Sequence, residues 1–376
     1  MSRAYWIITI SITFGLKGYC RHLKTMPEQS VDIKDLSLDA LRQWLEERGY
    51  KPFHAGQIFK WIWQRQVDDF EFMTDVGKQL RAGLQSHFHI GRLERVRLAR
   101  SADGSCKYLF RLMDGNFIES VLIPERGRMT LCISSQVGCA QGCRFCLTGR
   151  GGFVRNLTRG EILAQVRDIR RELPDPDQRL NIVLMGMGEP LANYRQVVSA
   201  IETLTDASYG LSVSGRRVTL STAGVAPQIV PLGQETAISL AVSLNAVDNA
   251  TRSDLMPINR RYPLERLLAA CRSFPLKPRS SITFEYILIK GLNDSPDQAR
   301  RLARLLHPIP AKINLIPFNP FEGCDFQRPN QGAVTAFQDQ LHAKHYTTIV
   351  RYSKGQDIGA ACGQLRVRQI RQGITG

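Results

Sequence analysis

Hydrophobic residues recur with a helical period between about residues 36 and 90. In "LDALRQWLEERG", apolar side chains return every three or four positions, and Gly49 supplies a stop signal. The stretch "AGQIFKWIWQRQV" repeats the pattern. Aromatic rings among lysines and arginines can stack on nucleic-acid bases, but a stripe at helical spacing is more often part of a core. The pattern predicts a small helical accessory domain, which we place at residues 30–95 as a candidate RNA-binding unit.

After about residue 95 the hydrophobic period changes to two. Two turn signals, Asp103–Gly104 and Asp114–Gly115, separate the alternating runs, and Asp-Gly between such runs is typical of hairpins. This predicts a short β-hairpin extension over residues 96–128. Glu119 stands in the third run, where an acidic residue usually faces solvent.

Beyond residue 128, six β-branched, buried-looking runs alternate with amphipathic stretches such as "GEILAQVRDIRREL". The runs are "TLCISSQ", "NIVLMGMGEP", "RVTLSTAG", "AISLAVSLNA", "SITFEYILIKGLND" and "KINLIPFNP". Repeated βα units predict an α/β fold with a parallel sheet covered by helices. Six units predict a partial (β/α)6 barrel over residues 129–355, followed by a C-terminal loop and tail over 356–376. Functional residues of barrels gather where strands end, and candidate polar residues fall there: the cysteines of 139–146, Glu189, Ser221, Asn245 and Asn319.

The first 25 residues differ from the rest of the chain. The apolar stretch "AYWIITISITFGL" has 13 residues, too few to span a bilayer, and no small-x-small cleavage site follows it. Met26 opens a polar stretch that leads into the first helical pattern. We interpret residues 1–25 as an extension outside the core, or as the product of a start assigned too far upstream. We expect a cytoplasmic protein without membrane association.

The charge balance narrows the choice of partner. Lys and Arg number 50 against 34 Asp and Glu, a net charge of +16. Such a surplus favours a polyanion, because Lys and Arg release counterions from phosphates. Alternatively, the positive charge could serve solubility or attract the protein to anionic lipid. Nucleic acid is the partner that the charge favours.

Three of the nine cysteines lie within eight residues, in "CAQGCRFC". The odd total and the tight cluster argue against a disulfide framework and indicate a reducing compartment. Cys139, Cys143 and Cys146 could bind zinc, although zinc ribbons normally supply paired Cys-x2-Cys knuckles or histidines. They could instead hold an iron–sulfur cubane with one iron open to a substrate that carries an amine and a carboxylate.

The spacing Cys-x3-Cys-x2-Cys matches the signature of the radical S-adenosylmethionine (SAM) enzymes, and "MGMGEP" is similar to their glycine-rich, glutamate-ending motif. The blocks "TLCISSQVGCAQGCRFCLTG", "NIVLMGMGEPLAN", "RVTLSTAGV", "AVSLNA", "KINLIPFNPFEG" and "RYSKGQDIGAACGQL" together resemble the adenine carbon-2 methyltransferases of 23S ribosomal RNA and tRNA. The resemblance runs from about Leu36 to Leu365. It implies a 4Fe–4S cluster and SAM as cofactors, 23S rRNA and tRNA as substrates, and a reducing electron-donor protein. A monomer is the plain expectation.

The resemblance also implies roles for individual residues. It places the cluster on Cys139, Cys143 and Cys146. It places contacts to SAM on Gly188, Glu189, Ser221, Ser243, Leu244, Asn245 and Asn319. It makes Cys362 the methyl carrier, Cys132 its partner thiol and Glu119 the proton acceptor. The chain departs from the family at Asn245, where His is common, and in "CLTG", which replaces a more usual polar residue after the third cysteine.

Carbon 2 of adenine is electron-poor and does not attack the electrophilic methyl group of SAM, which leaves a carbon radical as the open route. The resemblance implies that one SAM methylates Cys362 and that a second yields a 5′-deoxyadenosyl radical, which takes hydrogen from that methyl group. The methylene radical then adds to carbon 2. Glu119 takes the ring proton, and Cys132 attacks the Cys362 sulfur, so that methylated RNA is released as a disulfide forms between the two cysteines.

Other interpretations stay open from the residues alone. Without the resemblance, Cys362 and Cys132 would be ordinary buried residues and Glu119 a surface acid. Cys20, Cys106, Cys271 and Cys324 receive no role. The alternative functions are methylation of carbon 8 of the ribosomal adenosine and a non-catalytic, zinc-bearing RNA-binding module. An assay of the iron and zinc content of the protein distinguishes the zinc-bearing module from a radical SAM enzyme.

Overall fold

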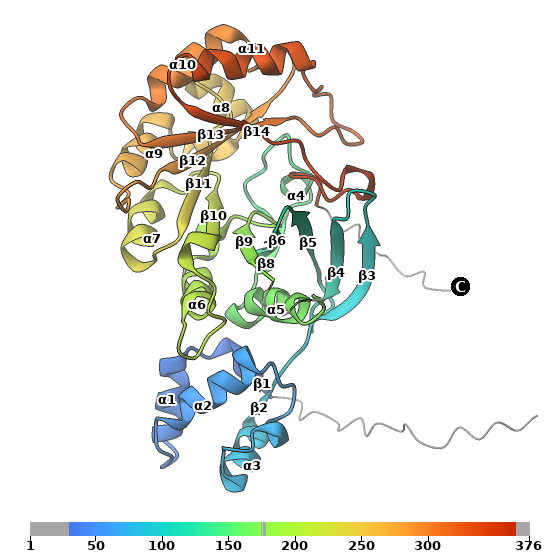
Figure 1. The fold of residues 1–376 in the computed structure, drawn as a ribbon, viewed down its shortest axis with the longest axis vertical. Helices are drawn as coiled ribbons and strands as arrows, with labels where there is room; N and C mark the ends of the chain where they lie inside the picture. Colours follow the sequence, from blue (N-terminus) through green and yellow to red (C-terminus); the bar gives the residue numbers. More distant parts are fainter. Residues whose placement is uncertain (1–29, 174, 176–177, 366–376) are drawn as a thin grey trace, which may run out of the picture.

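The computed structural model describes residues 30–173, 175 and 178–365. The extension proposed for residues 1–25 lies outside this range, as does the end of the C-terminal tail. Within the described range, no helix is both long and apolar enough to cross a membrane. The chain folds into a helical part at one end and a large sheet covered by helices (Figure 1).

Helices form in the first part of the chain where the hydrophobic period predicts them. They are α1 (Leu38–Glu46), α2 (His54–Phe59), which continues into a π-helical turn over Lys60–Gln64, and α3 (Lys78–His87). Two short strands, β1 (Val31–Asp32) and β2 (Phe88–His89), pair in parallel and bring the ends of this part together. Ser37 caps α1 by accepting a hydrogen bond from the Ala40 N–H, as expected for a helix start.

Two buried arginines of one helix hold these N-terminal helices against the barrel. Arg159 and Arg167 belong to α5 (Arg159–Arg170). Arg159 donates to the Leu36 carbonyl at 2.7 Å, and Arg167 donates to the Val67 carbonyl at 2.7 Å. Burial lowers the pKa of Arg159 to about 10. Since a buried charge is tolerated only when its hydrogen bonds are satisfied, these contacts fix how the two parts meet.

Three antiparallel strands follow, and they confirm the period of two. They are β3 (Glu94–Arg100), β4 (Cys106–Arg111) and β5 (Phe117–Glu125). The glycines of the two predicted turns, Gly104 and Gly115, have φ of 85° and 81°. This left-handed conformation favours glycine, which explains why both turns carry Asp-Gly.

Within the described residues, ten strands form one continuous sheet in the order β14-β13-β12-β11-β10-β9-β6-β5-β4-β3. In this sheet, β6 and the strands β9 to β14 pair in parallel. The strands β5, β4 and β3 continue the sheet beyond β6 in antiparallel pairing. The parallel strands are β6 (Arg128–Cys132), β9 (Leu180–Leu184), β10 (Val218–Thr222), β11 (Ser239–Ser243), β12 (Ile282–Leu288), β13 (Ala311–Pro317) and β14 (Thr347–Val350). The predicted α/β class with a parallel sheet is confirmed.

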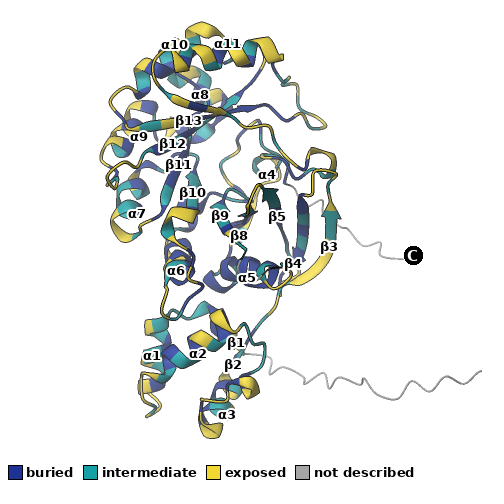
Figure 2. Ribbon diagram, viewed as in Figure 1, coloured by how far each residue is buried: buried dark blue, intermediate teal, exposed yellow. Residues whose placement is uncertain are grey.

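Helices connect the parallel strands and cover the outer face of the sheet (Figure 1). Besides α5 they are α6 (Tyr194–Thr205), α7 (Ile229–Glu235), α8 (Asn249–Leu255), α9 (Leu264–Arg272), α10 (Pro296–Leu306) and α11 (Gln331–His342). Their buried residues face the strands, while their outer faces are exposed (Figure 2). A short hairpin, β7 (Gln136–Gly138) with β8 (Phe153–Asn156), flanks the cysteine loop and the single-turn α4 (Leu147–Arg150).

The chain after β14 runs as a loop across the open end of the barrel to the antiparallel strands (Figure 1). We call residues 351–365 the C-terminal loop. It packs in a small hydrophobic cluster formed by Val121, Cys132, Met187, Ala360 and Leu365. The last strand of the barrel and the hairpin region are thereby joined above the ends of the parallel strands.

Candidate active site

Two adjoining cavities lie in the barrel. The small cavity is at the C-terminal ends of the parallel strands, and the large cavity extends into the barrel to Thr219 and Thr283, near the starts of β10 and β12. The small cavity has a volume of about 150 Å³ and the large cavity about 500 Å³. Nine of the predicted site residues line the small cavity. They are Cys139, Cys143, Cys146, Gly188, Glu189, Ser221, Ser243, Asn245 and Cys362. Residues that the sequence places far apart therefore meet in one space.

The three clustered cysteines are presented by the loop between β7 and α4. The Cys139 N–H donates to the Gly152 carbonyl at 2.7 Å, and the Cys146 N–H donates to the Cys143 carbonyl at 3.1 Å. Burial raises the pKa of Cys139 to about 12 and holds that of Cys143 well above its ordinary value. Thiols in such surroundings stay protonated until a metal displaces the protons.

The chemistry of this loop suits an iron–sulfur cluster. Three thiols open into one cavity that also carries hydrogen-bonding groups, and softer thiolate ligands select iron–sulfur clusters or zinc over hard cations. Within the described residues, no three His, Cys, Asp or Glu side chains are arranged to hold a single metal ion. The three cysteines are the residues that would hold a cluster here.

Gly188 and Glu189 follow β9 and form one wall of the small cavity. Gly188 has φ of 103°, and a Cβ there would lie 2.6 Å from the Cβ of Gln136, so no larger residue fits. The Glu189 carboxylate accepts hydrogen bonds from the Ala223 N–H at 2.6 Å and the Leu191 N–H at 3.0 Å. Burial nevertheless raises its pKa to about 7. A carboxylate held in this way is suited to receive an ammonium group.

Asn245 lines the small cavity, but its side chain is already engaged by the protein. It has φ of 61°, a left-handed conformation that Asn tolerates better than most residues. Its Oδ1 accepts from the Ile287 N–H at 2.8 Å, and its Nδ2 lies 3.2 Å from the Met256 sulfur. Asn245 therefore shapes the wall where strands β11 and β12 end. Its neighbour Leu244 is fully buried in the main core.

Asn319, a predicted contact to SAM, holds the C-terminal loop through its side chain. Its Nδ2 donates to the Ser353 Oγ at 2.7 Å and to the Cys362 carbonyl at 3.2 Å, and its Oδ1 accepts from Arg328 at 2.9 Å. The α4 region holds the same loop, because the Leu147 N–H donates to the Gly363 carbonyl at 2.7 Å. These contacts fix the backbone on both sides of the Cys362 thiol.

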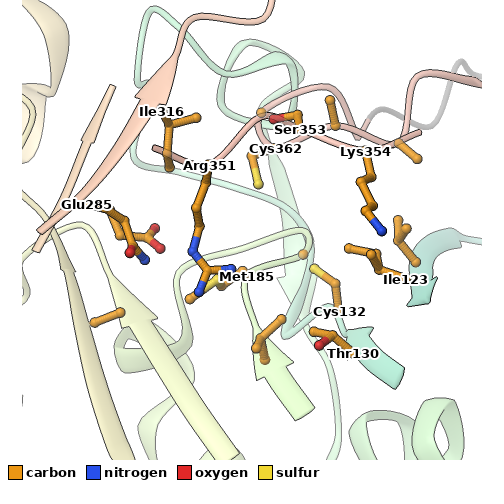
Figure 3. Close-up of a pocket in the computed structure, with 18 of the residues that line it drawn as sticks. Ile123, Thr130, Cys132, Met185, Glu285, Ile316, Arg351, Ser353, Lys354 and Cys362 are labelled. Carbon is orange, nitrogen blue, oxygen red and sulfur yellow. The ribbon is translucent and has the colours of Figure 1, made fainter. Parts of the chain in front are cut away.

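Cys362 lines both the small and the large cavity. Cys132 lines the large cavity and, among the described residues, is not part of the small one. Both thiols point into the large cavity, Cys362 from the C-terminal loop and Cys132 from the end of β6 (Figure 3). Burial is the main cause that raises the pKa of each thiol, to about 11 for Cys362. The Cys362 residue is exposed, and its thiol points into the large cavity. The negative charge of Glu285 adds to the rise, and Arg351 opposes it.

Glu119 lies beside the large cavity and is not a surface residue. It is 4% exposed, and its carboxylate forms an ion pair with Lys107 at 3.1 Å. On β5 it shares a face with Val121 and Ile123, because alternate residues of a strand point the same way, and these two line the large cavity. Within the described residues, Glu119 is next to this lining and not part of it.

Sequence reasoning missed four charged residues of the large cavity, Glu125, Glu285, Arg351 and Lys354. Glu285 lies in the middle of β12, where burial raises its carboxyl pKa and Arg351 opposes the rise. The Arg351 side chain reaches from the C-terminal loop into the cavity, toward Met185 (Figure 3). A charge within the otherwise apolar alternation of "ITFEYIL" was the available signal for Glu285. No local pattern marks Arg351.

Comparison with known proteins agrees with this geometry. Residues 133–303 match the radical SAM superfamily, and residues 31–90 match the ribosomal RNA large subunit methyltransferase N-terminal domain. A crystal structure of a radical SAM methyltransferase from Sphaerobacter thermophilus superimposes with a TM-score of 0.83 and 43% sequence identity, over 89% of this chain and 99% of that one. The barrel and its three-cysteine cavity thus define a radical SAM enzyme, with a 4Fe–4S cluster and SAM as its cofactors.

Two relatives narrow the class to a family. The dual-specificity RNA methyltransferase RlmN of Desulfosudis oleivorans is 53% identical over 89% of this chain and 90% of its own length. The protein of the same name from Pelobacter propionicus is 51% identical over 90% of this chain and 96% of its own length. The chain belongs to the RlmN family of dual-specificity RNA methyltransferases. The alternative of a non-catalytic zinc module is thereby excluded.

Proposed function

We propose that this radical SAM RNA methyltransferase methylates carbon 2 of adenosine, in 23S rRNA at the peptidyl transferase centre and in tRNA next to the anticodon, with Cys362 as the methyl carrier. The observation that carries the proposal is the position of Cys362 on the border of two cavities. A carrier must accept a methyl group from SAM and deliver it to RNA. A thiol that lines both spaces can do each in turn.

The small cavity is the proposed site of the cluster and SAM. Cys139, Cys143 and Cys146 would hold the cluster, which together with SAM supplies a carbon radical. Glu189 would receive the ammonium group of SAM. The proposed contacts also include Gly188, Ser221, Ser243, Leu244 and Asn245, with Leu244 contributing through its backbone because its side chain is in the core. Asn319 is also a proposed contact to SAM, and its side chain holds the backbone of Cys362.

The large cavity is the proposed site of the target adenine. Its volume of about 500 Å³ is within the range of small-molecule sites. RNA-modifying enzymes commonly take the target base out of its stack. An adenine here would have carbon 2 near Cys362, with Cys132 able to reach the sulfur of the adduct and Glu119 to accept the ring proton. Arg351, which enters this cavity (Figure 3), would contact a phosphate of the target nucleotide.

The remaining parts of the proposal concern partners and organisation. The charge of +16 supports RNA binding through phosphates, with residues 30–95 as an accessory RNA-binding domain and 96–128 as an extension of the barrel at 129–355. Residues 356–376 would carry the methyl-bearing cysteine. We further propose a cytoplasmic monomer that takes electrons from a reducing donor protein, because the free thiols need a reducing compartment.

The proposed function is tested by identifying the methylated nucleoside that the protein produces. Anaerobically reconstituted protein is incubated with SAM, a reductant and either an unmodified 23S rRNA fragment or an unmodified tRNA, and the RNA is digested to nucleosides for mass spectrometry. We expect 2-methyladenosine from both RNAs and none from the Cys362→Ala variant. Methylation at carbon 8 with none at carbon 2 would replace the proposed function by its alternative.

A further inference from the structure

Lys107 on β4 contacts two groups that belong to different parts of the proposed reaction. Its Nζ lies 3.1 Å from the Glu119 carboxylate, and it donates to the Gly359 carbonyl at 3.2 Å. Glu119 is the proposed proton acceptor, and Gly359 lies in the C-terminal loop, three residues before Cys362. One ammonium group thus connects the acceptor to the loop that carries the methyl group.

The register of the sheet places Lys107 on the reactive side. Lys107 pairs with Val121 on β5, and Val121 pairs with Cys132 on β6. Residues directly opposite one another in a sheet point to the same face, so these three residues form a row across the strands. Glu119 stands diagonally from Lys107, because it pairs with Leu109. Long side chains reach such diagonal neighbours.

The turn between β3 and β4 also binds the C-terminal loop, through residues other than Lys107. Asp103 accepts from the Gly355 N–H at 2.7 Å, and Asp357 accepts from the Ser101 hydroxyl at 2.6 Å. These hydrogen bonds lower the pKa of Asp103 to about 2 and also that of Asp357. The loop therefore has anchors that are independent of Lys107. What distinguishes Lys107 is its second contact.

We propose that Lys107 is a positioning residue that holds the Glu119 carboxylate in register with the methyl-carrying loop, so that Glu119 can take the proton from carbon 2. This inference rests on the proposed function. After the carbon–carbon bond has formed, carbon 2 still carries its original hydrogen. That hydrogen leaves as a proton to the Glu119 carboxylate, and the electron pair of the C–H bond stays with the ring. The unpaired electron left by radical addition departs with the sulfur pair that Cys132 and Cys362 form, as the bond between the Cys362 sulfur and carbon breaks. A neighbouring ammonium keeps the carboxylate ionised, which is the form that accepts a proton.

The experiment follows a single turnover of enzyme whose Cys362 already carries the methyl group. Methylation of Cys362 by SAM is measured first, without RNA, and formation of the protein–RNA adduct and its resolution are then measured in the single turnover. The wild type is compared with Lys107→Met, or with Lys107→Gln should the Met variant be insoluble. We expect methylation of Cys362 within about twofold of the wild type, an adduct that forms, and resolution at least about tenfold slower. This is a part of the 10²–10⁴-fold that a positioned base contributes. Lys107→Arg should recover most of the rate.

Two controls separate positioning of Glu119 from anchoring of the loop. Asp357→Ala removes another anchor of the same loop and should resolve the adduct within about twofold of the wild type. In a double-variant cycle, Lys107→Met combined with Glu119→Gln should be no slower than Glu119→Gln alone, because Lys107 acts through Glu119.

Four results would overturn the inference. They are wild-type resolution in Lys107→Met, an equal delay in Asp357→Ala, additive delays in the double variant, and loss of Cys362 methylation in Lys107→Met. A wild-type enzyme that forms no methylated Cys362 and no adduct would instead overturn the proposed function itself. The two failures are therefore distinguishable in one set of measurements.

Discussion

Cys362 and Cys132, which come from opposite ends of the barrel sequence, line one cavity, and Cys362 also lines the cavity of the cluster cysteines. The proposed methyl carrier is thereby accessible from two cavities. Cys132, its proposed partner thiol, lines the cavity proposed for the target adenine.

The two cysteines should fail differently when they are replaced. Cys362→Ala should bind RNA but form neither a methylated cysteine nor an adduct. Cys132→Ala should form the adduct and then stall, leaving protein joined to RNA, with turnover below about one hundredth of the wild type, as is usual when a covalent catalyst is removed. Denaturing gels with labelled RNA measure both. Normal turnover by Cys132→Ala without a shifted band would remove Cys132 from the mechanism.

Replacement of a cluster cysteine should remove the radical step and leave the fold intact. Cys143→Ala should form no 5′-deoxyadenosine, because one cluster ligand is lost. Cys143 is buried in a loop outside the main core, so we expect a cost of about 1 kcal/mol in unfolding free energy, in the usual range for such changes. Chromatography measures 5′-deoxyadenosine, and thermal melting compares the wild type and Cys143→Ala, both without the cluster. Methylated RNA from Cys143→Ala would contradict the assigned cluster ligands.

Methylation of Cys362 should depend on pH. Because the pKa of its thiol is raised to about 11, most of it is neutral at pH 7, and the thiolate is the nucleophile. The rate should therefore increase about tenfold per pH unit between pH 7 and 9 and level off only near the pKa. Mass spectrometry of the protein after incubation with SAM, without RNA, provides the rate.

Glu285→Gln is the matched variant for this pH profile. The Glu285 charge raises the Cys362 pKa, so its removal should lower that pKa and increase the methylation rate at pH 8 by a few fold. A rate that does not change with pH would show that ionisation of Cys362 does not limit its methylation.

RNA affinity should fall steeply with added salt. The charge of +16 predicts binding that depends on phosphate neutralisation, and each neutralised phosphate contributes a slope of about −0.7 to −0.9 in the logarithm of affinity against the logarithm of salt. Fluorescence anisotropy with a labelled tRNA over a fourfold range of salt measures the slope. A flat dependence would mean that the surplus charge does not bind RNA.

Arg351→Gln should reduce that slope by about 0.7 to 0.9, the contribution of one phosphate, and weaken RNA binding at low salt. Methylation of Cys362 should still occur, since SAM is assigned to the other cavity. Lys344→Gln is the control, because Lys344 is exposed before the N-terminal end of β14 and lines neither the small nor the large cavity. Equal effects of the two variants would assign Arg351 to general surface charge.

Much of the fold follows from local patterns. The Asp-Gly turns require backbone conformations that favour glycine, and the runs before Glu189, Ser221 and Asn245 are long enough to be recognised as buried strands. By contrast, the edge strand β14 has only four residues, "TTIV", and carries too little pattern to be predicted. The sequence thus predicts the six inner parallel strands and misses the seventh.

The site is less accessible to local reasoning, because tertiary contacts decide it. The local sequence predicts a surface position for Glu119, whereas in the structure it is buried and paired with Lys107. Asn319 contacts the Cys362 carbonyl only because residues 351–365 fold back across the barrel. Arg351 enters the large cavity for the same reason. None of these contacts has a signal within a window of ten residues.

The continuous sheet has a consequence for how this sequence can change by insertion. Glu119 and Cys132 face the reaction because β4, β5 and β6 keep a fixed register. One residue inserted between Glu119 and Val121 would turn Glu119 to the opposite face, whereas extra residues at the tip marked by Gly115 would leave the ladder unchanged. Descendants of this chain should therefore vary in the length of that turn and keep the spacing from Glu119 to Cys132 constant.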